Sequence, residues 1–323
     1  MTVTPPPGAT ATPSSPVICS GNTTNIVLSS TVPGTTYIWN VNQTTVTGGA
    51  DGTGNVIAQT LTTVANSQGE AVYAITPIVN GCPGSTIFVT VTVNPIPVAT
   101  ANPTSATICS GETTAIGLFS NIAGTTFSWT VGPTVVLGAS SGSGNIIAQT
   151  LKTASTVQET VTYTITPTAN GCPGAQISVT VTVNPTPEVF GPSTAIICSG
   201  ESPNISLSPS IPGTSIIWTV VQTGVSGASD STGSVTTSPF VIDQVLTTTG
   251  TAQGTAVYTI TPSANGCTGS SKSITLTVNP APVPVLKGGV ICVTQGTGET
   301  VKILFFATGL SNGGYGFAWF LQV

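Results

Sequence analysis

The sequence predicts an all-β protein made of tandem β-sandwich modules in a linear array. Three observations predict it: a long internal repeat, alternating apolar and polar residues within each repeat, and proline-rich joints between the repeats. A repeat of this length indicates structural modules that follow one another along the chain. Five landmarks of the first repeat recur 90 positions later: Cys19, Trp39, Leu61, Tyr73 and Cys82 are followed by Cys109, Trp129, Leu151, Tyr163 and Cys172.

A third copy has its landmarks at Cys198, Trp218, Leu246, Tyr258 and Cys267. The interval from Trp218 to Leu246 is six residues longer than the interval from Trp39 to Leu61. Insertions of this kind are tolerated in surface loops. We therefore expect a loop at residues 219–240.

Alternation with a period of two indicates β-strands with one buried face. Residues 87–93 place Ile and Val at every second position, and Tyr73 and Ile75 share one face of the preceding strand. Roughly seven short strands in about 90 residues, with one Trp and one late Tyr, are typical of an immunoglobulin-like sandwich. The Trp and Tyr landmarks are thus predicted core residues rather than a sugar-binding series: Trp39, Trp129, Trp218, Tyr73, Tyr163 and Tyr258.

The joints Asn94–Pro97, Asn184–Pro187 and Asn279–Pro284 have proline at alternate positions, which holds the backbone extended. They divide the chain into a linker, three modules and a partial fourth module: 1–8, 9–97, 98–187, 188–282 and 283–323. Three sandwiches joined end to end would form a rod on the order of 100 Å.

The partial fourth module, residues 283–323, contains Cys292 and Trp319 as its landmarks, but no second cysteine follows. We expect either a fragment of a longer protein or a unit that a neighbouring chain completes by adding strands to the edges 301–306 and 317–323. Cys292 is accordingly expected to be unpaired or intermolecular. The first seven residues do not resemble a signal peptide, so we expect the export signal further upstream.

Charged residues are scarce: four Lys, no Arg, no His and nine acidic residues make up 4% of the chain. Four scattered lysines cannot neutralise a phosphate backbone or bind an anionic membrane surface. No apolar run approaches the ~18 residues of a membrane span. Asp51, Asp230 and Asp243 do not cluster as calcium ligands do, and no acid–base pair suggests catalysis. We therefore expect no cofactor, no metal and no enzymatic activity.

Seven cysteines without histidine favour disulfides over zinc, and disulfides require an oxidising, extracellular compartment. The one early and one late cysteine of each module favour the pairs Cys19–Cys82, Cys109–Cys172 and Cys198–Cys267. However, these cysteines lie in turns that fall at opposite ends of a standard sandwich. A bridge from one module to the hairpin of the next, such as Cys19–Cys172, therefore remains open.

The shared motifs are Ile-Cys-Ser-Gly, Gly-Thr-Thr-aromatic-x-Trp, Tyr-x-Ile-Thr-Pro, Asn-Gly-Cys and Val-Thr-Val-Asn-Pro. Over residues 9–282 the chain resembles the PKD-like repeats of Bacteroidota surface proteins, including SprB-type gliding-motility adhesins exported by type IX secretion. The resemblance implies an extracellular stalk or adhesin on a bacterial cell surface. Asp230-Ser231-Thr232 matches the O-glycan acceptor motif of that phylum, which makes Ser231 a candidate glycosylation site.

The function that these observations favour is a non-enzymatic stalk segment of a bacterial adhesin or filament, whose partners are the neighbouring modules. Three alternatives remain. The array binds a surface polysaccharide or a host protein through loops such as 219–240, it spaces the catalytic domain of a secreted enzyme, or it assembles with further copies through residues 283–323.

Overall fold

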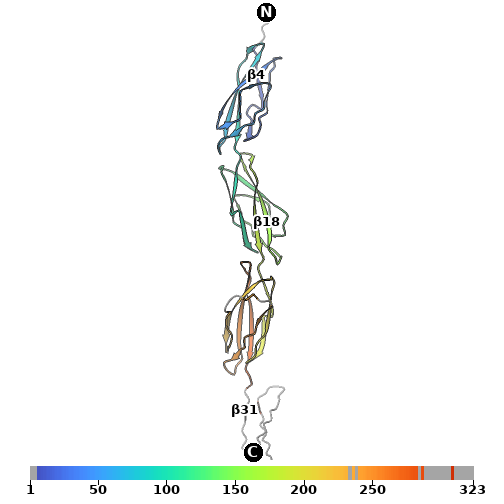
Figure 1. Cartoon of the computed structure of the whole chain (residues 1–323), viewed down its shortest axis with the longest axis vertical. Helices are drawn as coiled ribbons and strands as arrows, with labels where there is room; N and C mark the ends of the chain where they lie inside the picture. Colours follow the sequence, from blue (N-terminus) through green and yellow to red (C-terminus); the bar gives the residue numbers. More distant parts are fainter. Residues whose placement is uncertain (1–5, 232–234, 237–238, 283–284, 287–306, 309–323) are drawn as a thin grey trace, which may run out of the picture. The chain divides into compact units, whose positions relative to one another are not determined.

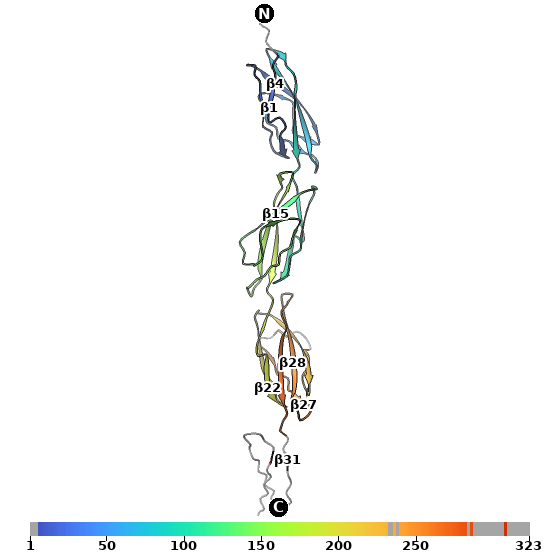
Figure 2. The same cartoon turned by 180° about the vertical axis from the view of Figure 1, so that it is seen from behind.

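The computed structural model describes residues 6–231, 235–236, 239–282, 285–286 and 307–308. Within these residues the regular secondary structure is β throughout, which confirms the predicted all-β class. The chain divides into two compact units, Met1–Pro185 and Thr186–Val323. The first unit contains two sandwiches, modules 1 and 2, and the second contains a third sandwich, module 3 (Figure 1, Figure 2).

Module 1 packs a three-stranded sheet, β1-β3-β7, against a larger sheet, β2-β11-β9-β4-β6, with β10 beside β9 and a separate β5-β8 pair. Its strands are β1 (Thr10–Thr12), β2 (Val17–Cys19), β3 (Ile26–Ser29), β4 (Thr36–Thr44), β5 (Val46–Thr47), β6 (Gly52–Thr53), β7 (Val56–Ile57), β8 (Thr62–Thr63), β9 (Gly69–Val79), β10 (Cys82–Pro83) and β11 (Ile87–Asn94).

Module 2 repeats this arrangement with the sheets β12-β14-β17 and β13-β20-β18-β15-β16, and with β19 beside β18. Its strands are β12 (Ala99–Asn102), β13 (Ser105–Cys109), β14 (Ile116–Ser120), β15 (Thr126–Val131), β16 (Gly142–Ser143), β17 (Ile146–Ile147), β18 (Glu159–Ala169), β19 (Cys172–Pro173) and β20 (Ile177–Asn184).

Module 3 has the sheets β21-β23-β26 and β22-β30-β28-β24, with β29 beside β28 and a β25-β27 pair. Its strands are β21 (Val189–Phe190), β22 (Thr194–Cys198), β23 (Ile205–Pro209), β24 (Ser215–Thr223), β25 (Val225–Ser226), β26 (Phe240–Ile242), β27 (Thr247–Thr248), β28 (Gly254–Ala264), β29 (Cys267–Thr268) and β30 (Lys272–Asn279). Further along, β31 (Val285–Leu286) pairs with β32 (Ala307–Thr308). The predictions for Cys292 and for the strand edges 301–306 and 317–323 lie outside the described residues.

One pairing in each large sheet is parallel. The short strand that ends at the early cysteine runs alongside the last strand of the same module, so Cys19 lies opposite Asn94. The same register places Cys109 opposite Asn184 and Cys198 opposite Asn279. Each early cysteine is therefore placed where its module ends.

Each module has its own hydrophobic core, filled by the alternating residues of the two sheets. Tyr73, Tyr163 and Tyr258 are fully buried, Trp39 and Trp129 are buried in their clusters, and Trp218 packs against its cluster while half-buried. In module 1, Gln59 and the carbonyl of Ala50 connect Tyr73 to Trp39 through hydrogen bonds. The Tyr73 hydroxyl donates to Gln59 Oε1 at 2.7 Å, while Gln59 Nε2 and Trp39 Nε1 both donate to the carbonyl of Ala50, at 2.6 Å and 3.2 Å.

Gln149 and Gln244 occupy the same place in modules 2 and 3 and accept from Tyr163 and Tyr258, each at 2.8 Å. Because each buried hydroxyl has an acceptor, the large Tyr side chain is buried without an unpaired polar group.

The predicted loop at 219–240 is wrong in its first part. Residues 219–223 belong to β24, which pairs with β28 as far as Thr223. Asp230 accepts from the backbone N–H of Val220 at 2.7 Å, as Asp51 accepts from that of Val41 at 2.8 Å. The six extra residues of module 3 therefore lie between Asp230 and β26. Part of that stretch, including Gly233, lies outside the described residues.

The buried tyrosines predict how stability depends on pH. Burial raises the pKa of Tyr73 and of Tyr258 to about 12 and raises that of Tyr163, whereas an unfolded tyrosine titrates near ~10. The folded state therefore holds these protons more tightly. Its stability should be complete below pH ~10 and should fall as the pH rises from ~10 to ~12. Thermal unfolding followed across this range measures the loss, and Tyr163→Phe should make the unfolding of module 2 less pH-dependent. Folded protein whose tyrosines all titrate near ~10 in an absorbance titration would contradict the prediction.

Candidate functional site at the joint between modules

The site begins with the early cysteine of module 1, at the end of β2. Because β2 pairs in parallel with β11, Cys19 lies beside Asn94, the first residue of the linker that leaves the module. The backbone N–H of Ser20 donates to the carbonyl of Asn94 at 2.8 Å and fixes the turn there. Cys19 therefore lies on the module 1 side of the joint.

The second half of the site is the late hairpin of module 2, where β18 turns into β19. Asn170 and Gly171 turn the chain with positive φ angles of 50° and 80°, a conformation that Asn and Gly adopt most readily. Gly174 follows the cysteine, and a Cβ at this position would overlap the carbonyl oxygen of Pro97, the last residue of the linker. The hairpin of module 2 is therefore packed against the incoming chain.

A disulfide joins the two halves. Cys19 bonds to Cys172 with a Cα–Cα distance of 5.6 Å, within the range typical of disulfides. The two cysteines flank the same four-residue linker, one on each module, and Cys172 is buried. The bond closes a sequence separation of 153 residues around the joint.

Amide hydrogen bonds reinforce the disulfide. Asn94, itself buried, donates from Nδ2 to the carbonyl of Asn170 at 3.0 Å and accepts at Oδ1 from Gln68 at 2.8 Å. On another side of the joint, Asn121 Nδ2 donates to Asn66 Oδ1 at 2.9 Å. These contacts are uncharged, as the composition requires, so Debye screening by salt should affect them little.

The favoured pairing within one module is therefore wrong in all three modules: Cys172 bonds to Cys19 rather than to Cys109, and Cys82 and Cys198 are free thiols. Cys82 lies in the β9–β10 hairpin at the beginning of β11, whereas Cys19 lies beside the end of that strand. The 8 residues of β11 rise about 27 Å at ~3.4 Å each, well beyond the reach of a disulfide. The alternative that the sequence left open, a bridge between neighbouring modules, is the one observed.

The remaining cysteines fall into two groups. Cys109 and Cys267 are disulfide-bonded. Cys82 and Cys198 are exposed free thiols within the described part of the chain. Cys292 lies outside it.

Two other candidate residues, Ser231 and Asp51, bond to the backbone of neighbouring strands. The Ser231 hydroxyl is bonded to the backbone of Trp218, accepting from its N–H at 3.1 Å. The described residues contain no group of three His, Cys, Asp or Glu side chains that could hold a metal ion. Asp51 has a pKa below its usual value because it accepts hydrogen bonds from Val41 N–H and from Asn40. These contacts join Asp51, which directly precedes β6, to the middle of β4.

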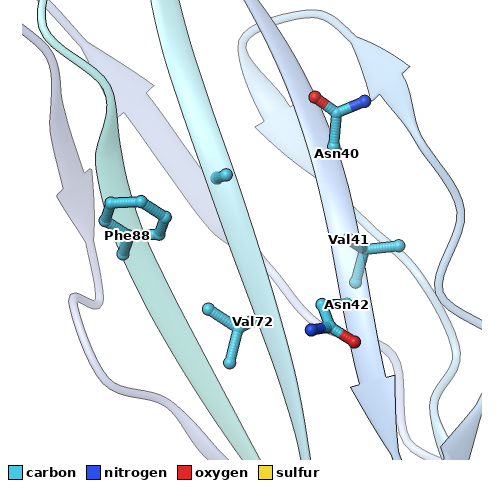
Figure 3. Close-up of a pocket in the computed structure, with 6 residues that line it drawn as sticks. Asn40, Val41, Asn42, Val72 and Phe88 are labelled. Atoms are coloured by element: carbon cyan, nitrogen blue, oxygen red, sulfur yellow. The ribbon is translucent and has the colours of Figure 1, made fainter.

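A shallow depression of about 290 Å³ lies on the outer face of module 1, over β4, β9 and β11 (Figure 3). Its lining residues are Asn40, Val41, Asn42, Val72, Ala74 and Phe88. Phe88 is 70% exposed, and its counterparts in the other modules are Ser178 and Ser273. The counterparts of Asn40 are Thr130 and Thr219, so the combination of an aromatic ring and two amides on this face distinguishes module 1 from the other modules.

The geometry defines the class of protein: an array of immunoglobulin-like β-sandwich modules, two of which are joined by a disulfide. A PKD-like domain model matches residues 16–97, 106–187 and 195–282. The chain therefore belongs to the PKD-like domain family, in three tandem copies, as the sequence motifs predicted. PKD-like modules that carry disulfides indicate an extracellular protein. This architecture is typical of extracellular adhesion or spacer arrays, which are generally non-catalytic.

No curated protein matches the chain in sequence. Three solved structures that align with the chain are the following. The human desmocollin-1 ectodomain has 12% identity and a TM-score of 0.30, and the alignment covers 87% of this chain and 63% of that one. A chain of the Dpr2 Ig1–Ig2 complex with DIP-Theta Ig1–Ig3 has 8% identity, a TM-score of 0.34 and coverage of 84% and 99%. The insect immune protein hemolin has 14% identity, a TM-score of 0.33 and coverage of 85% and 76%. The described residues contain no helix that is long and apolar enough to cross a membrane.

Sequence reasoning missed the amide side chains of the joint. In the sequence, Asn94 and Asn170 belong to the repeated Asn-Pro and Asn-Gly-Cys motifs, and Asn in such motifs is typical of turns. A signal was present, because Asn precedes the linker prolines at positions 94, 184 and 279 alike. A turn alone does not require that identity so consistently.

Proposed function

We propose that this chain is a load-bearing spacer segment of a bacterial cell-surface adhesin of the gliding or attachment type. In this role it has no enzymatic activity and holds other parts of the same protein away from the cell. The observation that carries the proposal is the Cys19–Cys172 disulfide, which ties two modules together across their linker. A linker of four residues would otherwise be the weakest point of such an array.

The position of the disulfide determines how the chain bears tension. A pull on the two ends of unit 1 enters at β1 and β2, reaches Cys19, and passes through the sulfur–sulfur bond to Cys172. The strands β3 to β18 lie inside the closed loop and carry none of that tension. Covalent bonds therefore bear the load, while hydrogen-bonded sheets only maintain the shape.

The composition supports the same role. Joints held by amide–amide and amide–carbonyl hydrogen bonds do not weaken with salt as ion pairs do. With four lysines and no arginine, the chain also offers few sites to trypsin-like proteases. Both properties suit a protein that works outside the cell.

Single-molecule force spectroscopy of the full chain tests the proposal. Under oxidising conditions, Cys19 and Cys172 should not separate, because the disulfide joins them. After reduction, the unfolded contour length should increase by about 500 Å or more, since 153 residues are released at roughly 3.4 Å each. Cys82→Ser removes a free thiol and should behave as the unaltered chain does. Equal contour lengths before and after reduction would contradict the load-bearing role.

A second candidate function is binding of a neutral polysaccharide by module 1. The observation that favours it is the exposed Phe88 ring on the same face as Asn40 and Asn42, from which it is separated by β9 (Figure 3). An exposed aromatic ring offers a flat apolar surface, and amides supply hydrogen bonds without charge. The same face in modules 2 and 3 presents Ser178 and Ser273 instead.

Phe88→Ser, which places in module 1 the residue type found in the other modules, should abolish binding to neutral glycans on an array. The thermal stability should stay within ~0.5 kcal/mol, because the side chain is exposed. The matched control is Phe119→Ser, which removes a ring that is 57% exposed on module 2. Glycan binding that survives Phe88→Ser, or that Phe119→Ser removes equally, would rule out this face as the binding site.

A further inference from the structure

We infer that Cys82 is the covalent attachment point for another PKD-like module joined ahead of module 1. In this arrangement its thiol forms a disulfide with the early cysteine of that module. The inference goes beyond the load-bearing proposal and does not depend on it, because it rests on the repeat geometry of the hairpin.

The first observation is the equivalence of Cys82 and Cys172. Both begin the short strand that pairs back onto the long hairpin strand, with Cys82 opposite Val79 and Cys172 opposite Ala169. Both are followed by Pro and Gly. Their surroundings differ in one respect: Cys172 is 2% exposed and bonded to the preceding module, whereas Cys82 is exposed and free.

The second observation is independent of the thiol and concerns the incoming chain. A Cβ on Gly84 would overlap the carbonyl oxygen of Pro7, just as a Cβ on Gly174 would overlap that of Pro97. The backbone N–H of Gly84 donates to Pro77 at 2.8 Å, as that of Gly174 donates to Pro167 at 2.8 Å. The segment entering module 1 therefore lies on its hairpin in the same way as the linker that enters module 2. The hairpin and the incoming segment around Cys82 therefore match the module 2 side of the joint between modules 1 and 2.

The third observation concerns the other half of such a joint. The early turn keeps its shape without a disulfide: Ser199 N–H donates to Asn279 at 2.8 Å, as Ser20 N–H donates to Asn94 at 2.8 Å, although Cys198 is free. Glu201 holds this turn further by accepting from the backbone N–H of Cys198 at 3.0 Å. An early Cys-Ser-Gly turn is therefore preorganised to present its thiol, and the loss of freedom on bonding is small.

These observations identify the partner by its chemistry. It is a Cys-Ser-Gly turn beside the final Asn of a PKD-like module whose Pro-x-Pro linker runs into Gly8. Asn80 turns the hairpin of module 1 with a φ of 46°, as Asn170 does in module 2 with a φ of 50°, so its carbonyl can accept from that final Asn. The contact is uncharged, like the one between modules 1 and 2.

The bond forms by thiol–disulfide exchange. A small-molecule disulfide accepts the two electrons. The Cys82 thiolate attacks one of its sulfurs and releases one thiol, and the partner thiolate then attacks the mixed disulfide and releases a second. Two protein thiols and one oxidant disulfide thus give one protein disulfide and two small thiols.

The test adds a module to the intact chain. A copy of residues 8–97 is fused directly before Gly8, so that the linker Asn94–Pro97 leads into module 1 as it normally leads into module 2. In the added copy, Cys82→Ser removes the competing hairpin thiol, and Val17→Ile, at an exposed position, changes the mass of the peptide that carries the added cysteine. The fusion is folded with oxidised and reduced glutathione, and its disulfides are mapped without reduction.

The expected product is a cross-linked peptide that joins Cys82 to the mass-shifted cysteine, with complete loss of maleimide labelling at Cys82. The Cys19–Cys172 bond in the same molecules reports that the neighbouring joint is intact. In the matched control, Cys19→Ser in the added copy should restore full labelling of Cys82. A second fusion guards against misfolding of the first. It carries a copy of residues 98–187 with Cys172→Ser and the mass marker Thr107→Ser, and should give the same bond to Cys82.

Labelling of Cys82 in both fusions, while Cys19–Cys172 is present, would overturn the inference. Disulfide-linked dimers of the unfused chain through Cys82 and Cys198 would also overturn it, because they would make Cys82 a contact between separate chains. Either result leaves the force measurement on unit 1 unaffected, so the two proposals can fail separately.

Discussion

The joint depends on the parallel pairing of the short strand before each early cysteine with the last strand of the same module. The first strand of each sandwich is divided: its first part, such as β1, joins the small sheet, and its second part, such as β2, crosses to the edge of the large sheet. Only the second part runs beside the strand that leaves the module. A cysteine at its end is therefore held at the exit, where the next module begins, and the disulfide follows from that position.

The module interior and the joint follow the same chemical rule, since both satisfy buried polar groups with neutral amides. Gln59 supports Tyr73 within the core, and Asn94 connects Gln68 to Asn170 across the joint. No buried side-chain nitrogen or oxygen among the described residues lacks a partner. A chain with 4% charged residues can therefore be rigid without ion pairs. Its stability should respond to high pH through the buried tyrosines.

Much of the fold could be predicted from the sequence, because the repeat supplied three copies of each signal. The alternation of apolar and polar residues predicted the strands, and the repeated landmarks predicted that the Trp and Tyr side chains lie in the core. The insertion in module 3 was placed too early, because a difference in spacing locates an extra segment only to the interval between two landmarks. The disulfide could not be chosen by spacing, since Cys82 and Cys172 are equivalent in sequence and differ only in which module lies beside them. Choosing between them required knowing that β2 pairs with β11 in parallel.

The central claim is that the disulfide of Cys19 connects neighbouring modules rather than the two ends of module 1. Mapping the disulfides of the purified, oxidised full chain tests it most directly. A protease that cleaves after aromatic and large apolar residues is needed, because lysines are too few. The account predicts a cross-linked pair of peptides that contain Cys19 and Cys172, together with a free thiol at Cys82. A cross-link between Cys19 and Cys82 would contradict it.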